Sequence, residues 1–114
     1  MHEMDIAMEI INIAVASIPS DNIDARVTRV NLQVGRLSAV IPNNLRFCFN
    51  IAAKDTPLEG AELNIEEIPV EACCNDCNHH WFIHEPIFLC EKCRSGSLDL
   101  LSGRELDIKS IEIT

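Results

Sequence analysis

The sequence predicts an α+β fold in which two helices pack on a three-stranded sheet, with an inserted zinc-ribbon-like lobe carrying two C-x-x-C motifs. Three observations lead to this fold class. Two segments repeat their apolar residues at helical spacing, and three segments alternate apolar with polar residues as half-buried strands do. Both C-x-x-C motifs fall in one stretch between the second and third of these strands.

The two predicted helices span residues 4–18 and residues 42 to about 54. The apolar face of the first is formed by Ile6, Ile10, Ile11, Ala14 and Ile18. The second opens at Pro42, a residue suited to the first helical turn. Its apolar face is formed by Leu45, Phe49 and Ala52. Each helix therefore has one stripe to bury against a sheet.

The three predicted strands span residues 26–35, 61–70 and 104–114. One face of the first strand is formed by Val30, Leu32 and Val34. Polar residues alternate with these three, so we expect the opposite face to meet solvent. In the third strand Ile111 and Ile113 alternate, but Ile108 is out of phase with them, which predicts a bulge.

The chain divides into an α/β domain, residues 1–71 and 99–114, and a separate lobe, residues 72–98. A lobe of this size cannot bury enough apolar surface to hold itself together. We therefore expect a metal inside it, whose binding energy would also be folding energy. Three aromatic side chains are expected either to pack the lobe's small core or to form a docking face: Trp81, Phe82 and Phe88.

Four paired cysteines in the lobe have the spacing of a structural zinc site. Cys74 and Cys77 form one C-x-x-C pair, and Cys90 and Cys93 form the other. Four thiolates leave no open coordination position, which is typical of structural rather than catalytic zinc. In a reducing compartment such pairs are more often metal ligands than disulfides.

Other metal-binding side chains leave alternatives open. Cys73 and Cys77 are also a possible pair, although Cys74 gives the usual two-residue gap. Cys48 lies between two phenylalanines and is expected to be a core thiol. Three histidines also lie in the lobe: His79, His80 and His84. They are either exposed loop residues, or one replaces a thiolate, or they modulate a second metal.

Charge and hydropathy exclude several classes of protein. The 114 residues carry a formal net charge of −9, which opposes binding to nucleic-acid phosphates and suits a cation or a partner with a basic face. No apolar run is long enough to span a membrane, and no signal peptide is evident. We expect a cytoplasmic protein. No nucleophile and base are arranged for catalysis, and four cysteine ligands leave a zinc hydrolase without an open position, so no enzyme activity is expected.

The N-terminal sequence Met1-His2-Glu3 offers a second kind of metal chemistry. An α-amine, the amide nitrogen of His2 and its imidazole lie close together in sequence. Deprotonated amide nitrogens with an imidazole suit a square-planar ion, which points to Ni(II) or Cu(II). Glu3 would add its amide nitrogen, or a carboxylate that orients the imidazole.

Taken in order along the chain, these motifs resemble the HypA/HybF family. The matching segments are the MHE start, VGRLS in the first strand, LRFCF in the second helix, EGAELNIEEIP in the second strand, the paired C-x-x-C motifs and the closing IKSIEI. Members of this family are nickel metallochaperones for [NiFe]-hydrogenase maturation, and for urease in some bacteria. The resemblance covers essentially the whole chain.

The resemblance implies a transported Ni(II) ion and a structural Zn(II) ion. It implies a nickel site at Met1, His2 and Glu3, and a zinc site at Cys74, Cys77, Cys90 and Cys93. Some members add an acidic nickel ligand near position 40, where this chain has Val40, so the fourth ligand would come from elsewhere. The partners implied are the maturation GTPase HypB and the hydrogenase large subunit. The two connections of the lobe would also permit a homodimer with exchanged lobes. The alternative is a zinc-ribbon module for protein interaction or transcription.

Overall fold

The computed structural model describes residues 2–22 and 24–114. The element order is α1 (Glu3–Ala16), β1 (Val27–Gly35), α2 (Pro42–Ala52), β2 (Glu62–Ile68), β3 (Val70–Cys74), β4 (His80–Ile83), β5 (Leu98–Leu100) and β6 (Leu106–Ile113). The chain forms two compact units. The first unit comprises the chain up to Gln33, Val40–Glu66 and Asp107–Thr114; the second comprises Val34–Ala39 and Glu67–Leu106.

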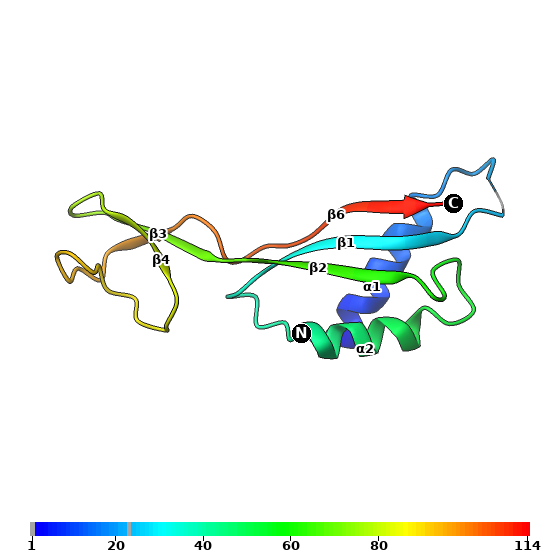
Figure 1. Ribbon diagram of the computed structural model, residues 1–114, viewed down its shortest axis with the longest axis horizontal. Helices are drawn as coiled ribbons and strands as arrows, with labels where there is room; N and C mark the ends of the chain where they lie inside the picture. Colours follow the sequence, from blue (N-terminus) through cyan, green and yellow to red (C-terminus); the bar gives the residue numbers. More distant parts are fainter. Residues whose placement is uncertain (1, 23) are drawn as a thin grey trace. The chain divides into compact units, whose positions relative to one another are not determined.

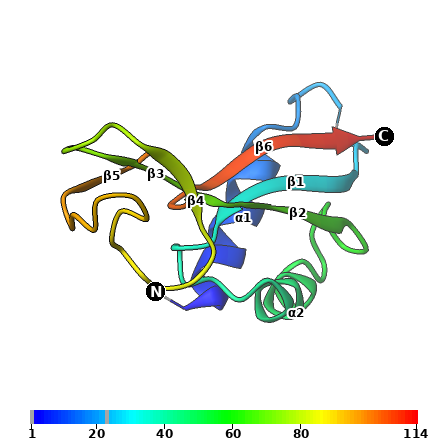
Figure 2. The ribbon, with the colours of Figure 1, turned by 60° about the vertical axis from the view of Figure 1, so that its left-hand side comes forward.

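The first unit is a three-stranded sheet with two helices, as the fold class predicted. Its strand order is β2-β1-β6, and α1 packs against α2 (Figures 1 and 2). Val30 and Leu32 of the central strand are at most 2% exposed, and Leu45 and Phe49 of α2 are fully buried. The core therefore lies between the helices and the apolar face of β1. Among the described residues, no helix combines the length and apolar character needed to cross a bilayer.

The polar face of this sheet is held by contacts between the three strands. Arg29 of β1 forms ion pairs with Glu62 of β2 at 3.0 Å and with Glu112 of β6 at 3.5 Å. The hydrogen bond and the negative charge of Glu62 raise the pKa of Arg29. Asn31 donates to the Ser110 hydroxyl at 3.0 Å. The side chains of Arg29 and Asn31 thus both contact β6 on the polar face of the sheet. This agrees with the alternation predicted for β1, in which polar residues occupy the face opposite the core.

Helix α1 starts one residue earlier and ends two residues earlier than the sequence predicted. It ends because Ser17 caps the last turn, with its N–H and its hydroxyl both donating to the Ile13 carbonyl, at 3.0 and 2.8 Å. Ile18 precedes Pro19, a position that disfavours helical backbone. The buried face consists of Ile6, Ala7, Ile10, Ile11 and Ala14, without Ile18.

The buried stripe of α2 differs from the prediction by one residue. Leu45 and Phe49 are buried as expected, but Ala53, at the C-cap, is buried in place of Ala52. Residues four apart lie over one another on a helix, so Ala53 continues the line from Leu45 through Phe49.

The predicted single strand over residues 61–70 is two strands. β2 ends at Ile68, and β3 begins at Val70 in the other sheet. Pro69 between them has no N–H to donate to a strand ladder. Its carbonyl instead accepts a hydrogen bond of 2.7 Å from the hydroxyl of Ser102. Pro69 therefore marks the point where the chain leaves the sheet β2-β1-β6 and enters the sheet β4-β3-β5.

The last strand, β6, also differs from its predicted pattern. Ile108 and Ile111 are half-buried, whereas Ile113 is 37% exposed, although the alternation of the sequence puts Ile111 and Ile113 on one face. The half-buried residues are three apart rather than two. This spacing agrees with the sequence, in which Ile108 does not follow the two-residue alternation of Ile111 and Ile113.

The second unit contains a three-stranded antiparallel sheet of its own, with β3 between β4 and β5 (Figure 2). Neither β4 nor β5 was predicted from the sequence. One face of this sheet forms a small apolar core from Val70, Ala72, Ile83, Trp81, Leu98 and Leu100. Phe82 and Phe88 are 50% and 42% exposed, so the expectation that they pack this core is wrong. Phe82 is excluded because successive strand residues point to opposite faces.

Candidate metal centre

Four cysteine side chains converge at one end of the second unit. Cys74 ends β3, Cys77 follows in the turn, and Cys90 and Cys93 come from the turn before β5. Their sulfur atoms all lie within 4.8 Å of one another. Cys74 and Cys90 are fully buried, whereas Cys77 and Cys93 are exposed. The structure thus brings together the four cysteines that the spacing singled out.

The distances between the sulfurs fit a tetrahedral ion. The Sγ atoms of Cys74 and Cys93 are 3.5 Å apart, and so are those of Cys77 and Cys90. A Zn–S bond of about 2.3 Å places two tetrahedral sulfurs about 3.8 Å apart. A disulfide needs about 2.05 Å, and all four thiols are free. The donor set therefore fits zinc, with every coordination position filled by the protein.

The two cysteine turns are closed in the same way. The N–H of Asn78 donates to the Cys74 carbonyl at 2.9 Å, and the N–H of Arg94 donates to the Cys90 carbonyl at 2.9 Å. Asn78 and Arg94 both have left-handed backbone, with φ of 61° and 66°. The left-handed residue after each second cysteine reverses the chain, so that both sulfurs of a pair face the same point.

Hydrogen bonds between the turns hold them against each other. The Ser95 hydroxyl donates to the Asp76 carboxylate. His79 Nε2 lies 2.7 Å from the Glu91 carboxylate, and its ring stacks on Trp81 with centroids 5.5 Å apart. A polar shell of this kind orients the residues that surround a metal. His79 therefore lies beside the cluster as a partner of Glu91, not among the four clustered groups.

The thiols differ in acidity before a metal binds. Burial raises the pKa of Cys90, but the N–H groups of Cys93 and Lys92 donate to its sulfur at 3.4 Å each and bring that pKa down to about 6. A backbone hydrogen bond from His79 lowers the pKa of Cys77, but burial and sharing of hydrogen bonds with the other thiols raise it to about 12. Of these two thiols Cys90 is thus the more acidic, and a metal must displace the proton of Cys77.

The remaining candidate ligands lie outside this cluster. Cys73 is half-buried in β3, and its thiol contacts the Cys74 carbonyl at 3.8 Å. Cys48 is half-buried in α2. His80 begins β4 and His84 follows it, both exposed. Within the described residues, the four cysteines are the one group of three or more metal-binding side chains gathered this closely.

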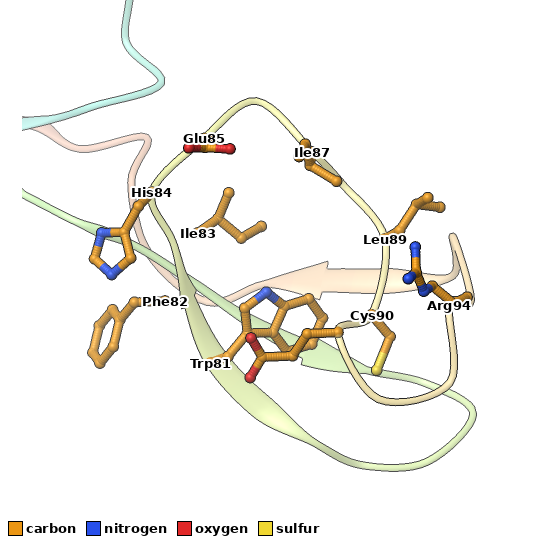
Figure 3. Close-up of a pocket in the computed structure, with 10 residues that line it drawn as sticks. Trp81, Phe82, Ile83, His84, Glu85, Ile87, Leu89, Cys90 and Arg94 are labelled. Atoms are coloured by element: carbon orange, nitrogen blue, oxygen red, sulfur yellow. The ribbon is translucent and has the colours of Figure 1, made fainter.

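A hollow of about 380 Å³ lies beside β4 and the loop that leads to the second cysteine turn. Figure 3 shows Trp81 and Ile83 on one side of the β4 backbone, and Phe82 and His84 on the other. The hollow is lined mainly by apolar side chains, with Arg94 at one end. Sequence reasoning missed it, because its walls depend on the pairing of a strand that was not predicted.

The predicted nickel-binding segment begins the first unit. Met1 lies outside the described residues. His2 is exposed and is the N-cap of α1, with extended backbone of φ −93° and ψ 146°. Its carbonyl accepts the N–H groups of Asp5 and Ile6, at 3.0 and 3.3 Å. The carboxylate of Glu3 accepts the N–H of Ile41 at 3.4 Å, at the start of α2.

Comparison with known proteins agrees with this architecture along the whole chain. A family model described as "Hydrogenase/urease nickel incorporation, metallochaperone, hypA" matches residues 1–113. The hydrogenase maturation factor HypA of Desulfosudis oleivorans is 59% identical over 113 residues, which cover 99% of this chain and 98% of that protein. The HypA of Desulfatibacillum aliphaticivorans is 56% identical, covering 99% and 87%.

Two solved structures are similar. The solution structure of the Ni metallochaperone HypA from Helicobacter pylori has a TM-score of 0.61 at 26% identity, covering 98% of this chain and 97% of that one. A second HypA solution structure, at 24% identity, has a TM-score of 0.71 over 100% of this chain and 97% of that one, and supports the fold.

Fold and site together define a small α+β protein with a metal-binding lobe of four cysteines. Its class is that of the metallochaperones, which carry a metal and are not enzymes. The chain belongs to the HypA family of hydrogenase maturation factors. The family resemblance seen in the sequence is thereby confirmed.

Proposed function

We propose that this protein binds Ni(II) through Met1, His2 and Glu3 and delivers it for [NiFe]-hydrogenase maturation, while Zn(II) holds the four-cysteine lobe together. The observation that carries the proposal is the position of His2. Its side chain is exposed at the first turn of a helix rather than packed in a core. An exposed imidazole can take up an ion and release it again.

The backbone at this position supports square-planar binding. The first N–H groups of an α-helix have no carbonyl partner four residues before them. The amide nitrogens of His2 and Glu3 therefore stand outside the helical hydrogen-bond ladder of α1. An ion that displaces an amide proton there costs the helix none of its ladder bonds. This setting suits the amide and imidazole donors that Ni(II) prefers in a planar site.

The contacts of Glu3 assign it a positioning role. Its carboxylate bonds to the N–H of Ile41, which ties the start of α1 to the start of α2. Val40, the neighbouring residue, carries no ligand atom in its side chain. The proposed ligands are thus nitrogen atoms of the N-terminal segment, with Glu3 fixing where that segment lies.

The two metals serve different purposes in this scheme. Two of the four zinc ligands are buried, and all of them come from turns that hydrogen bonds hold in place. Such a site exchanges its ion slowly and stabilises the lobe of residues 72–98. The nickel site belongs to the domain of residues 1–71 and 99–114 and is open to solvent, as delivery requires.

The partners proposed are the GTPase HypB and the hydrogenase large subunit, with urease as a further recipient and a homodimer as the assembled state. The net charge of −9 favours a basic face on a partner. An association driven in this way weakens as salt is added. Binding to purified HypB that is equally tight at low and high ionic strength would argue against this basis for recognition.

The deciding experiment is nickel titration of untagged, zinc-loaded protein beside His2→Ala and His84→Ala variants. Both substitutions remove one exposed imidazole, so His84→Ala is the matched control. We expect the parent and the control to bind one nickel per chain more than His2→Ala does, with zinc content unchanged in all three. If His2→Ala binds as many nickel ions as the parent, at the same affinities, the N-terminal site is refuted.

A further inference from the structure

We propose that the outer face of the sheet β4-β3-β5 carries a second, exchangeable site for a divalent transition-metal ion, formed by His80, Cys73 and Asp99. This site is separate from the four-cysteine cluster and from the N-terminal segment. It uses the doubled cysteine of the sequence, whose first member neither proposed metal site employs.

The strand register places these three residues in one row. Cys73 of β3 is paired with His80 of β4 on one side and with Asp99 of β5 on the other. Residues directly opposite each other in a sheet project from the same face. A thiol, an imidazole and a carboxylate therefore leave neighbouring strands side by side, with the thiol in the middle.

The backbone hydrogen bonds show which of the two neighbours of Cys73 lies closer to it. The N–H of Cys74 donates to the His79 carbonyl, so the next pair along, Cys73 with His80, is not hydrogen-bonded. Opposite Cα atoms lie about 4.5 Å apart in such a pair, and about 5.5 Å apart in a hydrogen-bonded one. The backbones of His80 and Cys73 are thus closer together than those of Asp99 and Cys73, which favours an ion bound by the imidazole and the thiolate together.

The apolar core of the lobe lies on the opposite face of this sheet, so the row of Cys73, His80 and Asp99 takes no part in it. Val70, Ala72 and Cys74 point into the lobe, where Trp81, Ile83, Leu98 and Leu100 pack. Cys73, by alternation, points outward and is only half-buried, although cysteine is among the residues most often fully buried. Phe82 and His84 leave β4 on the side opposite Trp81 and Ile83 (Figure 3). Glu71, paired with Phe82, adds a second carboxylate to the outer face.

The donor set determines the class of ion. A thiolate, an imidazole and a carboxylate together suit borderline ions such as Ni(II) and Zn(II) rather than Mg(II) or Ca(II). The three donors leave coordination positions for water, so the ion can exchange, unlike one held by four cysteines. In the present rotamers the ligand atoms are not gathered as the four thiols are. Capture requires these side chains to rotate toward one another, from backbone positions that the strand register places in one row.

The test uses the zinc-loaded chain carrying His2→Ala, so that the N-terminal segment contributes no imidazole. Ni(II) is titrated in, thiolate-to-nickel charge-transfer absorption is recorded, and zinc is counted at each point. We expect this variant to bind one nickel ion, with a thiolate band. Adding Cys73→Ser should abolish the band, and His80→Gln should weaken binding by more than about tenfold, since even outer-shell partners of a metal are worth that much. Zinc should stay at one per chain throughout.

Two matched variants complete the design. Cys48→Ser removes the other thiol outside the cluster, and His84→Gln removes the other exposed imidazole beside β4. Both should leave the band and the affinity unchanged. A thiolate band that survives Cys73→Ser, or no band at all, overturns the proposal. Loss of zinc from Cys73→Ser also overturns it, because Cys73 would then belong to the four-cysteine site. None of these outcomes depends on whether His2 binds nickel.

Discussion

Asn78 and Arg94 occupy equivalent positions in the two cysteine turns, one residue after the second cysteine, and share a left-handed backbone with φ of 61° and 66°. Asparagine tolerates this conformation well, whereas arginine has no special suitability for it. The second turn therefore carries strain that the first largely avoids. Zinc ligation by Cys90 and Cys93 would hold it in place.

The first prediction concerns this strained position. Arg94→Gly should leave the lobe as stable or slightly more stable, whereas Arg94→Val should destabilise it by roughly 1–3 kcal/mol, because a β-branched residue is strongly disfavoured at positive φ. Both variants lose the guanidinium, so their difference isolates the backbone effect. Chemical denaturation of the zinc-loaded proteins measures it. Equal stability of the two variants would show that the turn does not need this conformation.

The second prediction concerns a close approach between two backbones. A Cβ added to Gly35 would clash with the backbone of Gly103 and Arg104. The N–H of Gly35 also bonds to the Glu105 carbonyl at 2.7 Å, so the two segments cannot separate freely. We expect Gly35→Ala to lower the free energy of unfolding by about 1–3 kcal/mol or more.

Gly96 provides the matched control for this substitution. A Cβ there would come no closer than 3.7 Å to the Leu89 side chain, which is ordinary contact. Gly96→Ala should therefore change the midpoint of denaturation little. If Gly35→Ala is tolerated as well as Gly96→Ala, the close approach does not constrain the fold.

The third prediction concerns removal of zinc. Trp81 is the chain's single tryptophan, and it packs on the lobe's core and stacks on His79. Its fluorescence therefore reports on the lobe alone. A strong chelator should shift Trp81 emission toward that of exposed indole, while the far-ultraviolet helix signal of α1 and α2 persists. Simultaneous loss of both signals would show that the helices also depend on zinc.

The fourth prediction concerns acid. Amide nitrogens must lose protons to bind nickel, so nickel affinity should fall as the pH drops from neutral. Zinc is held by four thiolate ligands, two of them buried, in turns that hydrogen bonds hold in place, so zinc should be retained over this interval. Metal content after dialysis at pH 7 and pH 6 tests the order. Loss of zinc before nickel would contradict it.

Much of the fold could be predicted because its signals are local. The apolar stripes of α1 and α2 and the alternation in β1 arise from residues two to four apart, and the structure contains all three elements near their predicted bounds. The spacing of the C-x-x-C pairs likewise made Cys74 a better partner for Cys77 than Cys73. The four cysteines lie together as that spacing indicated. Whether they hold zinc, and whether His2 holds nickel, stay predictions.

The sequence by itself thus determined the helices, the central strand and the identity of the clustered cysteines, since each depends on near neighbours in the chain. The tertiary structure decided what depends on pairing between distant segments. Pro69 divides one predicted strand between two sheets, and β4 and β5 are too short to be recognised without β3. The row of His80, Cys73 and Asp99 exists only through the register of those strands. A shift of one residue in that register would turn the side chains to the opposite face, and no local pattern in the sequence specifies it.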